Sequence, residues 1–310
     1  MTESDANGTL PDLVVIGVAK AGTTSLFRYL AQHPDVCPSD VKELRYFSTV
    51  RYGEPLPPLA DYRRHFAHCR GERYRMEATP GYYAGGRRVA DSMADLLPGA
   101  RVVVSFRDPV QRCWSWFRFV RSTARIPKNM SFAHYVDRCL RLHEEGTDGT
   151  RANQAFWGVG GGCYDTWFQP WRDVFGDRFR VEFFEDVVRD PRSTTEGLCG
   201  WLGIDVEVCA GFRYGVENKT VQYKLKGLQK AALAVNRRSE RFFATHPELK
   251  SALRGAYYKV NSDDAEQRMD AATRERLAAF YAPHTERLAT LLAGTGIVDT
   301  PDWLTAARRV

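Results

Sequence analysis

Short apolar runs alternate with helix-spaced apolar positions through the first two thirds of the chain. Runs rich in Val, Ile and Phe predict strands buried on both faces of a parallel sheet, at 13–16, 101–106 and 179–184. Helical spacing is found in a segment that ends at His33-Pro34 and again at 89–97, 109–122, 163–175 and 191–202. Strands that alternate with helices predict an α/β fold with a central parallel sheet flanked by helices.

The last third of the chain is helical by pattern, from about 221 to 258 and from 271 to 292, with Pro247 and Pro283 as expected breaks. The stretch 146–162 is rich in Gly, Thr and Asn, and we expect it to be a mobile loop. No repeat or low-complexity linker interrupts the chain. We therefore expect a flexible N-terminus at 1–12 and a single domain at 13–310, with a helical C-terminal portion from about 221 to 310.

The composition of the chain limits the kinds of ligand and partner that it is expected to bind. The chain has 310 residues, of which 44% are hydrophobic and 26% charged, as in ordinary globular proteins. Its 44 basic and 38 acidic residues suit a phosphorylated ligand or an acidic acceptor, but the excess is too small to indicate nucleic acid. The seven cysteines are scattered without a Cys-x-x-Cys pair, so neither a disulfide framework nor a zinc site is expected. With a polar N-terminus and no early apolar run long enough to span a bilayer, these features predict a cytoplasmic protein.

A glycine-rich turn, Gly17-Val-Ala-Lys-Ala-Gly-Thr-Thr24, joins the first predicted strand to the first predicted helix. Its glycines let the backbone wrap an anion while amide groups converge at the helix N-terminus. A P-loop that binds ATP has lysine directly after the second glycine, whereas here Thr23 follows and Lys20 lies inside the turn. This suits a nucleotide whose 5′ end carries one phosphate and a transferable group. The predicted binding residues are Lys20, Ala21, Gly22, Thr23, Thr24 and Ser25.

A second polar cluster, Arg107-Asp-Pro109, follows the predicted strand 101–106. Side chains at the C-terminal end of a central strand point into the crevice where α/β proteins hold ligands. The Arg107 guanidinium offers a rigid fork for phosphate, and Ser115, two turns into the next helix, could add a hydroxyl to the same anion.

Several segments together resemble 3′-phosphoadenosine 5′-phosphosulfate (PAPS)-dependent sulfotransferases of the heparan-sulfate type and their bacterial relatives. They are 11–34, 42–47, 77–83, 102–117 and 182–204. The resemblance implies a fold like that of P-loop-containing nucleoside triphosphate hydrolases, with PAPS as co-substrate and no metal for the transfer. It implies that the glycine-rich turn holds the 5′-phosphosulfate, and that Arg107 and Ser115 hold the 3′-phosphate.

The resemblance also nominates a general base. Lys42-Glu-Leu-Arg-Tyr-Phe47 is similar to a family segment whose glutamate takes the acceptor proton, which assigns that role to Glu43. A carboxylate in a closed cleft can remove a proton from an attacking hydroxyl. The other sulfotransferase branch uses histidine, and His33, His65 and His68 are the alternatives.

A late basic segment at 218–227 is loosely similar to the family's loop over the nucleotide, and Lys224 and Lys226 are candidates for the 3′-phosphate side. The expected acceptor is a small molecule, lipid or carbohydrate that supplies a hydroxyl or an amine. A second copy of the chain is an open option as partner.

Two rival functions remain at this stage. A P-loop kinase of a small metabolite predicts lysine after Gly22 and an acidic metal ligand after a buried strand, where Thr23 and Arg107 stand instead. A nucleotide-binding protein without catalysis is disfavoured because Lys20 and Glu43 are both present.

Overall fold

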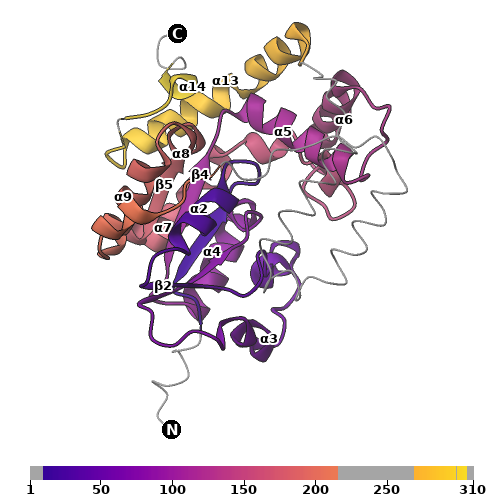
Figure 1. The fold of residues 1–310 in the computed structure, drawn as a ribbon. Coiled ribbons are helices and arrows are strands. Elements are labelled where there is room, and N and C mark those ends of the chain that lie inside the picture. The colour runs from indigo at the N-terminus through magenta and orange to yellow at the C-terminus, as the bar shows by residue number, and fades with distance from the viewer. Residues whose placement is uncertain (1–9, 216–268, 298, 306–310) are drawn as a thin grey trace, which may run out of the picture.

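Five parallel strands form the centre of the molecule, in the order β2-β3-β1-β4-β5 (Figure 1). The computed structural model describes residues 10–215, 269–297 and 299–305. The strands are β1 (Leu13–Gly17), β2 (Val36–Pro38), β3 (Tyr74–Ala78), β4 (Arg101–Phe106) and β5 (Phe179–Phe183). This sheet confirms the predicted fold class and the three predicted strands.

Helices cover both faces of the sheet (Figure 1). The α-helices of the described residues are α2 (Thr23–Leu30), α3 (Leu59–Arg63), α4 (Gly86–Leu96), α5 (Pro109–Ser122), α6 (Phe132–Glu144), α7 (Asp165–Phe175), α8 (Phe184–Arg189), α9 (Pro191–Leu202), α13 (Ala271–Ala293) and α14 (Asp302–Thr305). Helix α9 ends at Gly203, which caps it with a left-handed φ of 70°. The predicted helix at 221–258, with Pro247, lies outside the described residues.

Alternate residues of β1 face the two layers of helices, as the pleat of a strand requires. Leu13 and Val15 pack in a cluster with α2 and α9. Val14 and Ile16 pack in a second cluster with α4 and α7. Because both sets are fully buried, the strand shows no polar alternation, which is why a continuous apolar run predicted it.

The expected break at Pro283 is wrong. Helix α13 runs through it without interruption from Ala271 to Ala293. Leu277 and Tyr281 are buried before the proline, and Leu288 and Leu292 after it. Packing on both sides therefore holds one helix in spite of the lost backbone donor.

The structure differs from the expected mobile loop at 146–162, because three glycines of this stretch are buried in a regular turn. Gly160–Gly162 form a buried turn of 3₁₀ helix. A Cβ on Gly162 would lie 2.7 Å from the Tyr281 hydroxyl, which itself donates a hydrogen bond to the carbonyl of Val159 at 2.8 Å. Here the missing side chains allow close packing against α13.

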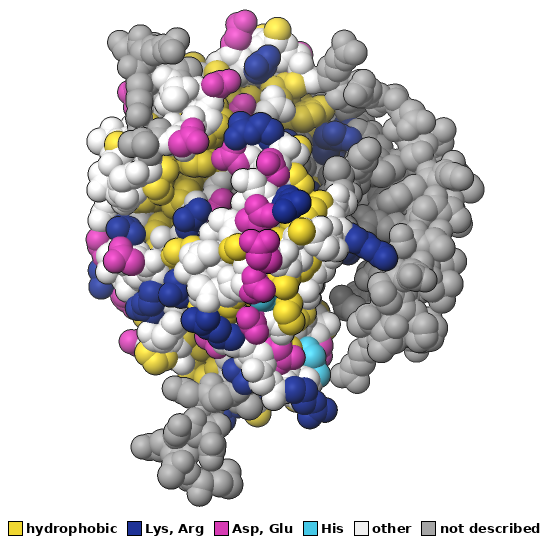
Figure 2. All heavy atoms as spheres, turned by 60° about the vertical axis from the view of Figure 1, so that its left-hand side comes forward, with side chains coloured by type: hydrophobic (Ala, Val, Ile, Leu, Met, Phe, Trp, Pro, Cys, Tyr) yellow, Lys and Arg dark blue, Asp and Glu magenta, His cyan; other side chains and the backbone are white. Residues whose placement is uncertain are grey.

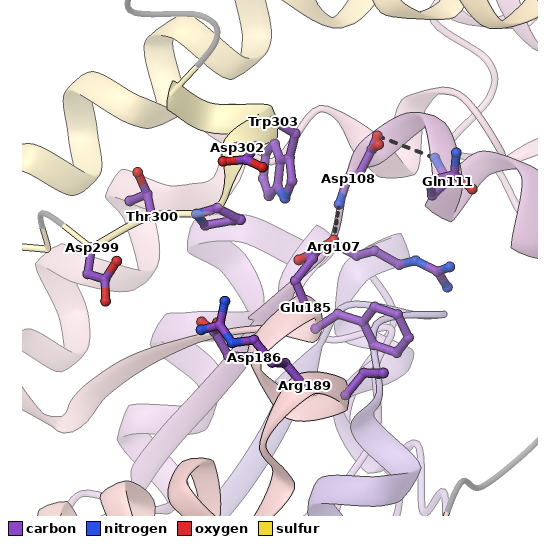
Figure 3. Close-up of a pocket in the computed structure, with 13 residues that line it drawn as sticks. Arg107, Asp108, Gln111, Glu185, Asp186, Arg189, Asp299, Thr300, Asp302 and Trp303 are labelled. Atoms are coloured by element: carbon purple, nitrogen blue, oxygen red, sulfur yellow. Dashed lines mark hydrogen bonds and ion pairs between the residues drawn. The ribbon is translucent and has the colours of Figure 1, made fainter.

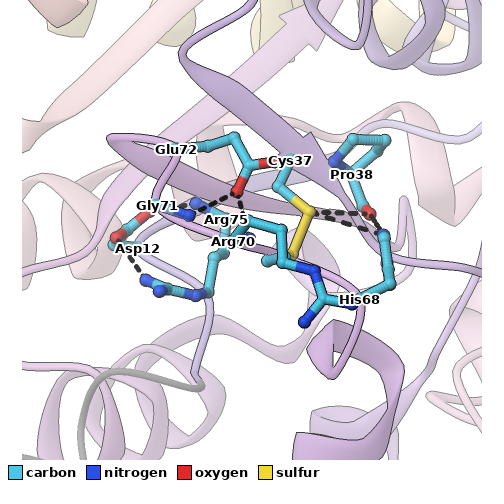
Figure 4. Close-up of a disulfide and its surroundings, with 9 residues drawn as sticks. Asp12, Cys37, Pro38, His68, Arg70, Gly71, Glu72 and Arg75 are labelled. Atoms are coloured by element: carbon cyan, nitrogen blue, oxygen red, sulfur yellow. Dashed lines mark hydrogen bonds and ion pairs between the residues drawn. A yellow bond between two sulfur atoms is a disulfide. The ribbon is translucent and has the colours of Figure 1, made fainter.

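A disulfide joins Cys37 in β2 to Cys69 (Figure 4). The expectation that the cysteines form no disulfide is therefore wrong for this pair. The two residues are separated by 32 positions in the chain, and only the docking of the α3 region beside β2 brings them together. The other five cysteines are free and buried.

Surface charge on one face of the molecule is mixed (Figure 2). On that face, Lys and Arg side chains are interspersed with Asp and Glu side chains. Within the described ranges, no helix combines the length and apolar character needed to cross a bilayer.

A close approach at Gly17 gives a test of the fold. A Cβ there would lie 2.7 Å from the Cβ of the fully buried Tyr83. We expect Gly17→Ala to lower the free energy of unfolding in urea by about 1–3 kcal/mol, the usual effect of overpacking. The control is Gly81→Ala, where a Cβ would meet no atom within 4 Å. Equal stability of the two variants would contradict this packing.

Candidate active site

The glycine-rich turn lies between β1 and α2, at the C-terminal edge of the sheet. It is tied to the neighbouring strand by a hydrogen bond from the Val18 amide to the Ser105 carbonyl, at 2.9 Å. Gly22, with a φ of 79°, lies directly before α2 and has no side chain that could cap the helix. The first amides of α2 are therefore available to an anion.

The remaining predicted residues of this turn lie where that anion would bind. Ala21 and Thr23 are buried, and Thr24 and Ser25 are half-buried in the first turn of α2. A Cβ on Gly22 would approach the Phe184 ring to 3.0 Å, so the turn packs directly on the start of α8.

Lys20 is the cation inside the turn, and its backbone is left-handed with φ of 76°. Its ammonium lies over the ring of Phe119 of α5, 4.9 Å from the centroid. Burial lowers the pKa of Lys20 to about 8, with further lowering by the charges of Arg107 and Arg118 and an opposing effect of Glu43. The site therefore gathers several positive charges around one loop, which favours an anionic ligand.

Arg107 is positioned by the end of β4 and the start of α5. Asp108 caps α5 by accepting a hydrogen bond from the Val110 amide at 2.8 Å, and Pro109 occupies the first turn. This directs the Arg107 guanidinium to the glycine-rich turn, where Nη1 donates to the Lys20 carbonyl at 3.1 Å. Burial lowers the pKa of Arg107, which nonetheless stays charged at any physiological pH.

Ser115 lies on α5 and is half-buried, and its hydroxyl has no hydrogen-bond partner within the described part of the chain. Lys224 and Lys226 lie outside the described residues. The structure thus brings Lys20 and Arg107 into contact, while Ser115 is placed on the helix that follows Arg107.

A cavity of about 710 Å³ adjoins Arg107 (Figure 3). Residues at the start of α5, from α8 and from the C-terminal stretch 299–303 line it. Among the described residues, three buried polar atoms in its wall lack hydrogen-bond partners: Glu185 Oε2, Thr300 Oγ1 and Trp303 Nε1. These acceptors and this donor are shut off from water, so each would have to turn toward the cavity to bind a molecule there. The sequence analysis did not identify these residues.

Glu43 lies between two cations, with its carboxylate 3.6 Å from Lys42 Nζ and 3.3 Å from Arg45 Nη2. Its side chain is 31% exposed. Burial lowers the pKa of Lys42, and the Glu43 carboxylate opposes that shift. Since Glu43 also acts on the pKa of Lys20, the proposed base and the loop lysine belong to one electrostatic cluster.

A fully buried carboxylate, Glu77 at the end of β3, supports the segment that carries Glu43. Tyr62, Thr79 and Tyr82 donate hydroxyl hydrogen bonds to it, those from Thr79 and Tyr82 measuring 2.8 and 2.6 Å. Burial raises the pKa of Glu77, and these three donors oppose the rise.

The same hydroxyls continue the network toward the proposed base. Thr79 Oγ1 accepts from the Arg45 amide at 3.1 Å, and Tyr82 Oη accepts from the Phe47 amide at 3.3 Å. The hydroxyl protons of Thr79 and Tyr82 are thus directed at the Glu77 side chain. Residues 77–83 belong to a segment that carries the family resemblance, but no pattern in the sequence indicates this supporting role.

The alternative bases are engaged elsewhere. The His33 ring is buried, with one nitrogen 2.8 Å from the Asp205 carbonyl and the other accepting from the Asp35 amide. His65 pairs with Asp40 at 2.5 Å, and His68 lies 3.0 Å from the Pro38 carbonyl beside the disulfide. These structural contacts favour Glu43 over the histidines.

The sequence and the fold of this chain are both similar to those of known proteins. A model of the sulfotransferase family matches residues 59–208. The fold resembles the crystal structure of a sulfotransferase from Alicyclobacillus acidocaldarius, with a TM-score of 0.66 and 25% identity, over 96% of this chain and 99% of that chain. Just under half of the chain therefore matches the sulfotransferase family, and nearly the whole chain shares its fold with a bacterial sulfotransferase. The predicted family and its P-loop-like fold are confirmed.

Curated relatives match shorter parts of this chain. A membrane-associated sulfotransferase, kil1, of Dictyostelium discoideum is 28% identical over 164 residues, covering 49% of this chain and 34% of that protein. A bifunctional heparan sulfate N-deacetylase/N-sulfotransferase 1 of Caenorhabditis briggsae is 24% identical over 203 residues, covering 63% of this chain and 23% of its own length. The chain thus spans about a third or less of these relatives. The family match includes Glu77, Arg107 and Ser115, but begins after Glu43.

The lowered pKa of Lys20 can be measured directly. In acetic anhydride labelling followed by peptide mass spectrometry, the reactivity of Lys20 should rise with a midpoint near pH 8. Sulfate should move that midpoint upward, because a bound anion stabilises the ammonium form. A midpoint equal to that of the other lysines would show that Lys20 is not buried beside Arg107.

Proposed function

We propose that the protein transfers a sulfuryl group from PAPS to a hydroxyl or amine of an acceptor. The observation that carries the proposal is the contact of Arg107 Nη1 with the Lys20 carbonyl, at 3.1 Å, on the turn that begins α2. Two cations and the free amides of a helix N-terminus then face one anion. The match to the sulfotransferase family makes a nucleotide that carries a sulfuryl group the most economical ligand.

The charges around Arg107 favour one orientation of the nucleotide. Five acidic side chains and only two arginines line the cavity, so a phosphate inside it would be repelled. The Arg107 guanidinium points away from Asp299 and Asp302 (Figure 3). The phosphates would lie on the side of the glycine-rich turn, with Arg107 and Ser115 at the 3′-phosphate. The neutral adenine would occupy the cavity, where Glu185, Thr300 and Trp303 offer it hydrogen bonds.

The proposed reaction is an in-line displacement at sulfur. Glu43 takes the acceptor proton as the acceptor oxygen or nitrogen bonds to sulfur. The bond between sulfur and the bridging phosphate oxygen breaks, and Lys20 and the α2 amides stabilise the charge that develops on that oxygen. Adenosine 3′,5′-bisphosphate leaves with the electron pair. Preorganised donors of this kind supply much of the rate enhancement in group transfer.

The rival functions fit the geometry less well. A kinase needs an organised metal and a phosphate-binding lysine after Gly22, but Thr23 follows that glycine and Arg107 follows β4. A protein that only binds nucleotide has no need for a carboxylate held beside Lys20 by a buried network. We therefore propose that the transfer step requires no metal.

The proposal also includes a class of acceptor and a cellular compartment. We retain a small molecule, lipid or carbohydrate as the acceptor class and a second copy of the chain as an optional partner. The cytoplasmic location predicted from the sequence is opposed by one structural observation, the Cys37–Cys69 disulfide. Such bonds persist mainly in oxidising compartments. Alkylation of free thiols before mass analysis of the cellular protein would distinguish the two settings.

Nucleotide binding provides the first test. A charge-assisted hydrogen bond contributes roughly 1.5–3 kcal/mol, so two or three contacts should make adenosine 3′,5′-bisphosphate bind about 10²–10⁴-fold more tightly than AMP. Arg107→Ala should remove most of this ratio by weakening the bisphosphate alone. Calorimetric titration measures all of these affinities.

The matched control is Arg189→Ala. This second arginine of the cavity wall pairs with Asp186 and should leave the ratio nearly unchanged. If the wild type shows no preference for the bisphosphate, PAPS is not the ligand. Equal weakening of both nucleotides by Arg107→Ala would make Arg107 a structural residue.

The role of Glu43 provides the second test. Glu43→Gln should lower turnover with PAPS by about 10²–10⁴-fold, the usual contribution of a general base, with little change in nucleotide affinity. The assay follows the gain of a sulfo group by mass spectrometry across acceptor classes. Glu54→Gln, which alters an exposed carboxylate paired with Arg151, is the control. Full activity of Glu43→Gln would return the role to a histidine or to water.

A further inference from the structure

Two imidazoles and a thiol meet where three segments of the fold come together, outside the proposed active site. His143 lies near the end of α6, Cys163 directly before α7, and His284 in the middle of α13. One potential ligand atom of each lies within 4.8 Å of the others. Nitrogen and sulfur ligands of this kind are those that Zn²⁺ prefers. Ligand atoms around a tetrahedral Zn²⁺ are about 3.5 Å apart, so modest side-chain rotations would close the site.

Each histidine already has a carboxylate behind it. His143 Nδ1 is 2.8 Å from Asp148 Oδ2, and His284 Nδ1 is 2.7 Å from Asp165 Oδ1. A carboxylate at one ring nitrogen orients the ring and leaves the other nitrogen for a metal, and zinc-binding histidines are almost always supported in this way. Two independent histidines with the same support are difficult to explain as isolated surface ion pairs.

The surroundings favour a dication. The side chains of Asp148 and Asp165 are only 10% and 7% exposed, and Cys163 is buried. Arg287 pairs with Asp165, and its Nη2 also lies 3.0 Å from His284 Nδ1, so one cation already offsets part of this charge. A divalent ion in the cluster would offset the remaining charge of the two aspartates and that of the thiolate which its binding creates.

A second group of possible metal ligands differs from the cluster around Cys163. Cys37, His68 and Cys69 also lie close together, but both of those sulfurs are joined in the disulfide (Figure 4). They are therefore not available as thiolates. The cluster around Cys163 retains a free thiol.

We propose that His143, Cys163 and His284 bind one structural Zn²⁺, with water as the fourth ligand. Binding forms a zinc–sulfur bond and releases the thiol proton to solvent. Because the ligands come from α6, the start of α7 and α13, the ion would fasten α13 to the helices beneath it. Contacts of α13 with α5, α6 and α7 give the same assembly without the ion, so the metal adds stability to an existing interface. The proposed sulfuryl transfer uses none of these residues.

The test uses the complete chain without an affinity tag, purified without chelators and incubated with zinc. Elemental analysis should find one zinc per chain, and a chelator should lower the thermal unfolding midpoint. Replacement of zinc by Co²⁺ should produce near-ultraviolet absorption from thiolate-to-cobalt charge transfer, which Cys163→Ser should abolish. These readouts need no nucleotide, so they stand or fall separately from the proposed activity.

Variants locate the site. His143→Ala and His284→Ala should each abolish stoichiometric zinc, and Asp148→Asn should weaken its affinity about 10- to 100-fold, as loss of a supporting carboxylate does. His134→Ala on α6 is the matched control and should bind zinc as the wild type does.

Zinc-free wild type after incubation, or wild-type zinc affinity in both histidine variants, would overturn the proposal. If Cys163→Ser fails to fold, the histidine variants and the wild-type titration still decide it.

Discussion

A carboxylate that is shut off from water must be hydrogen-bonded by the protein, and Glu77 places this requirement at the centre of the fold. Three hydroxyl groups satisfy it, and two of them accept backbone amides from the segment that carries Glu43. The end of β3, helix α3 and the segment of the proposed base are thus joined by one buried carboxyl group. The position of Glu43 beside Lys20 is a result of this network rather than of its own exposed ion pairs.

Much of the fold could be predicted because its signals are local. Strand β4 is a continuous apolar run, and Asp108 with Pro109 marks the start of α5 by a cap and a fixed φ. The features that were not predicted depend on distant contacts. Packing on both flanks overrides Pro283, and the disulfide depends on where the α3 region docks.

The same distinction applies to the candidate site. The glycine-rich turn and Arg107 each follow a strand, so the geometry of a parallel sheet was enough to predict that they meet. The cavity next to them was not predictable. One wall comes from α8 and the other from residues 299–303, which carry no motif and reach the sheet by long-range packing such as that of Trp303 on Phe183 of β5.

That shared cavity links ligand binding to the end of the chain. Glu185 lies on one wall and Trp303 on the other, so a molecule held between them contacts both (Figure 3). The contacts with Trp303 exist only while the stretch 299–305 is docked. By thermodynamic linkage, docking therefore raises affinity for the occupant by the same factor by which the occupant favours docking. Residues 299–305 would then hold the occupant in the cavity. The resistance of this stretch to proteases would report whether the cavity is filled.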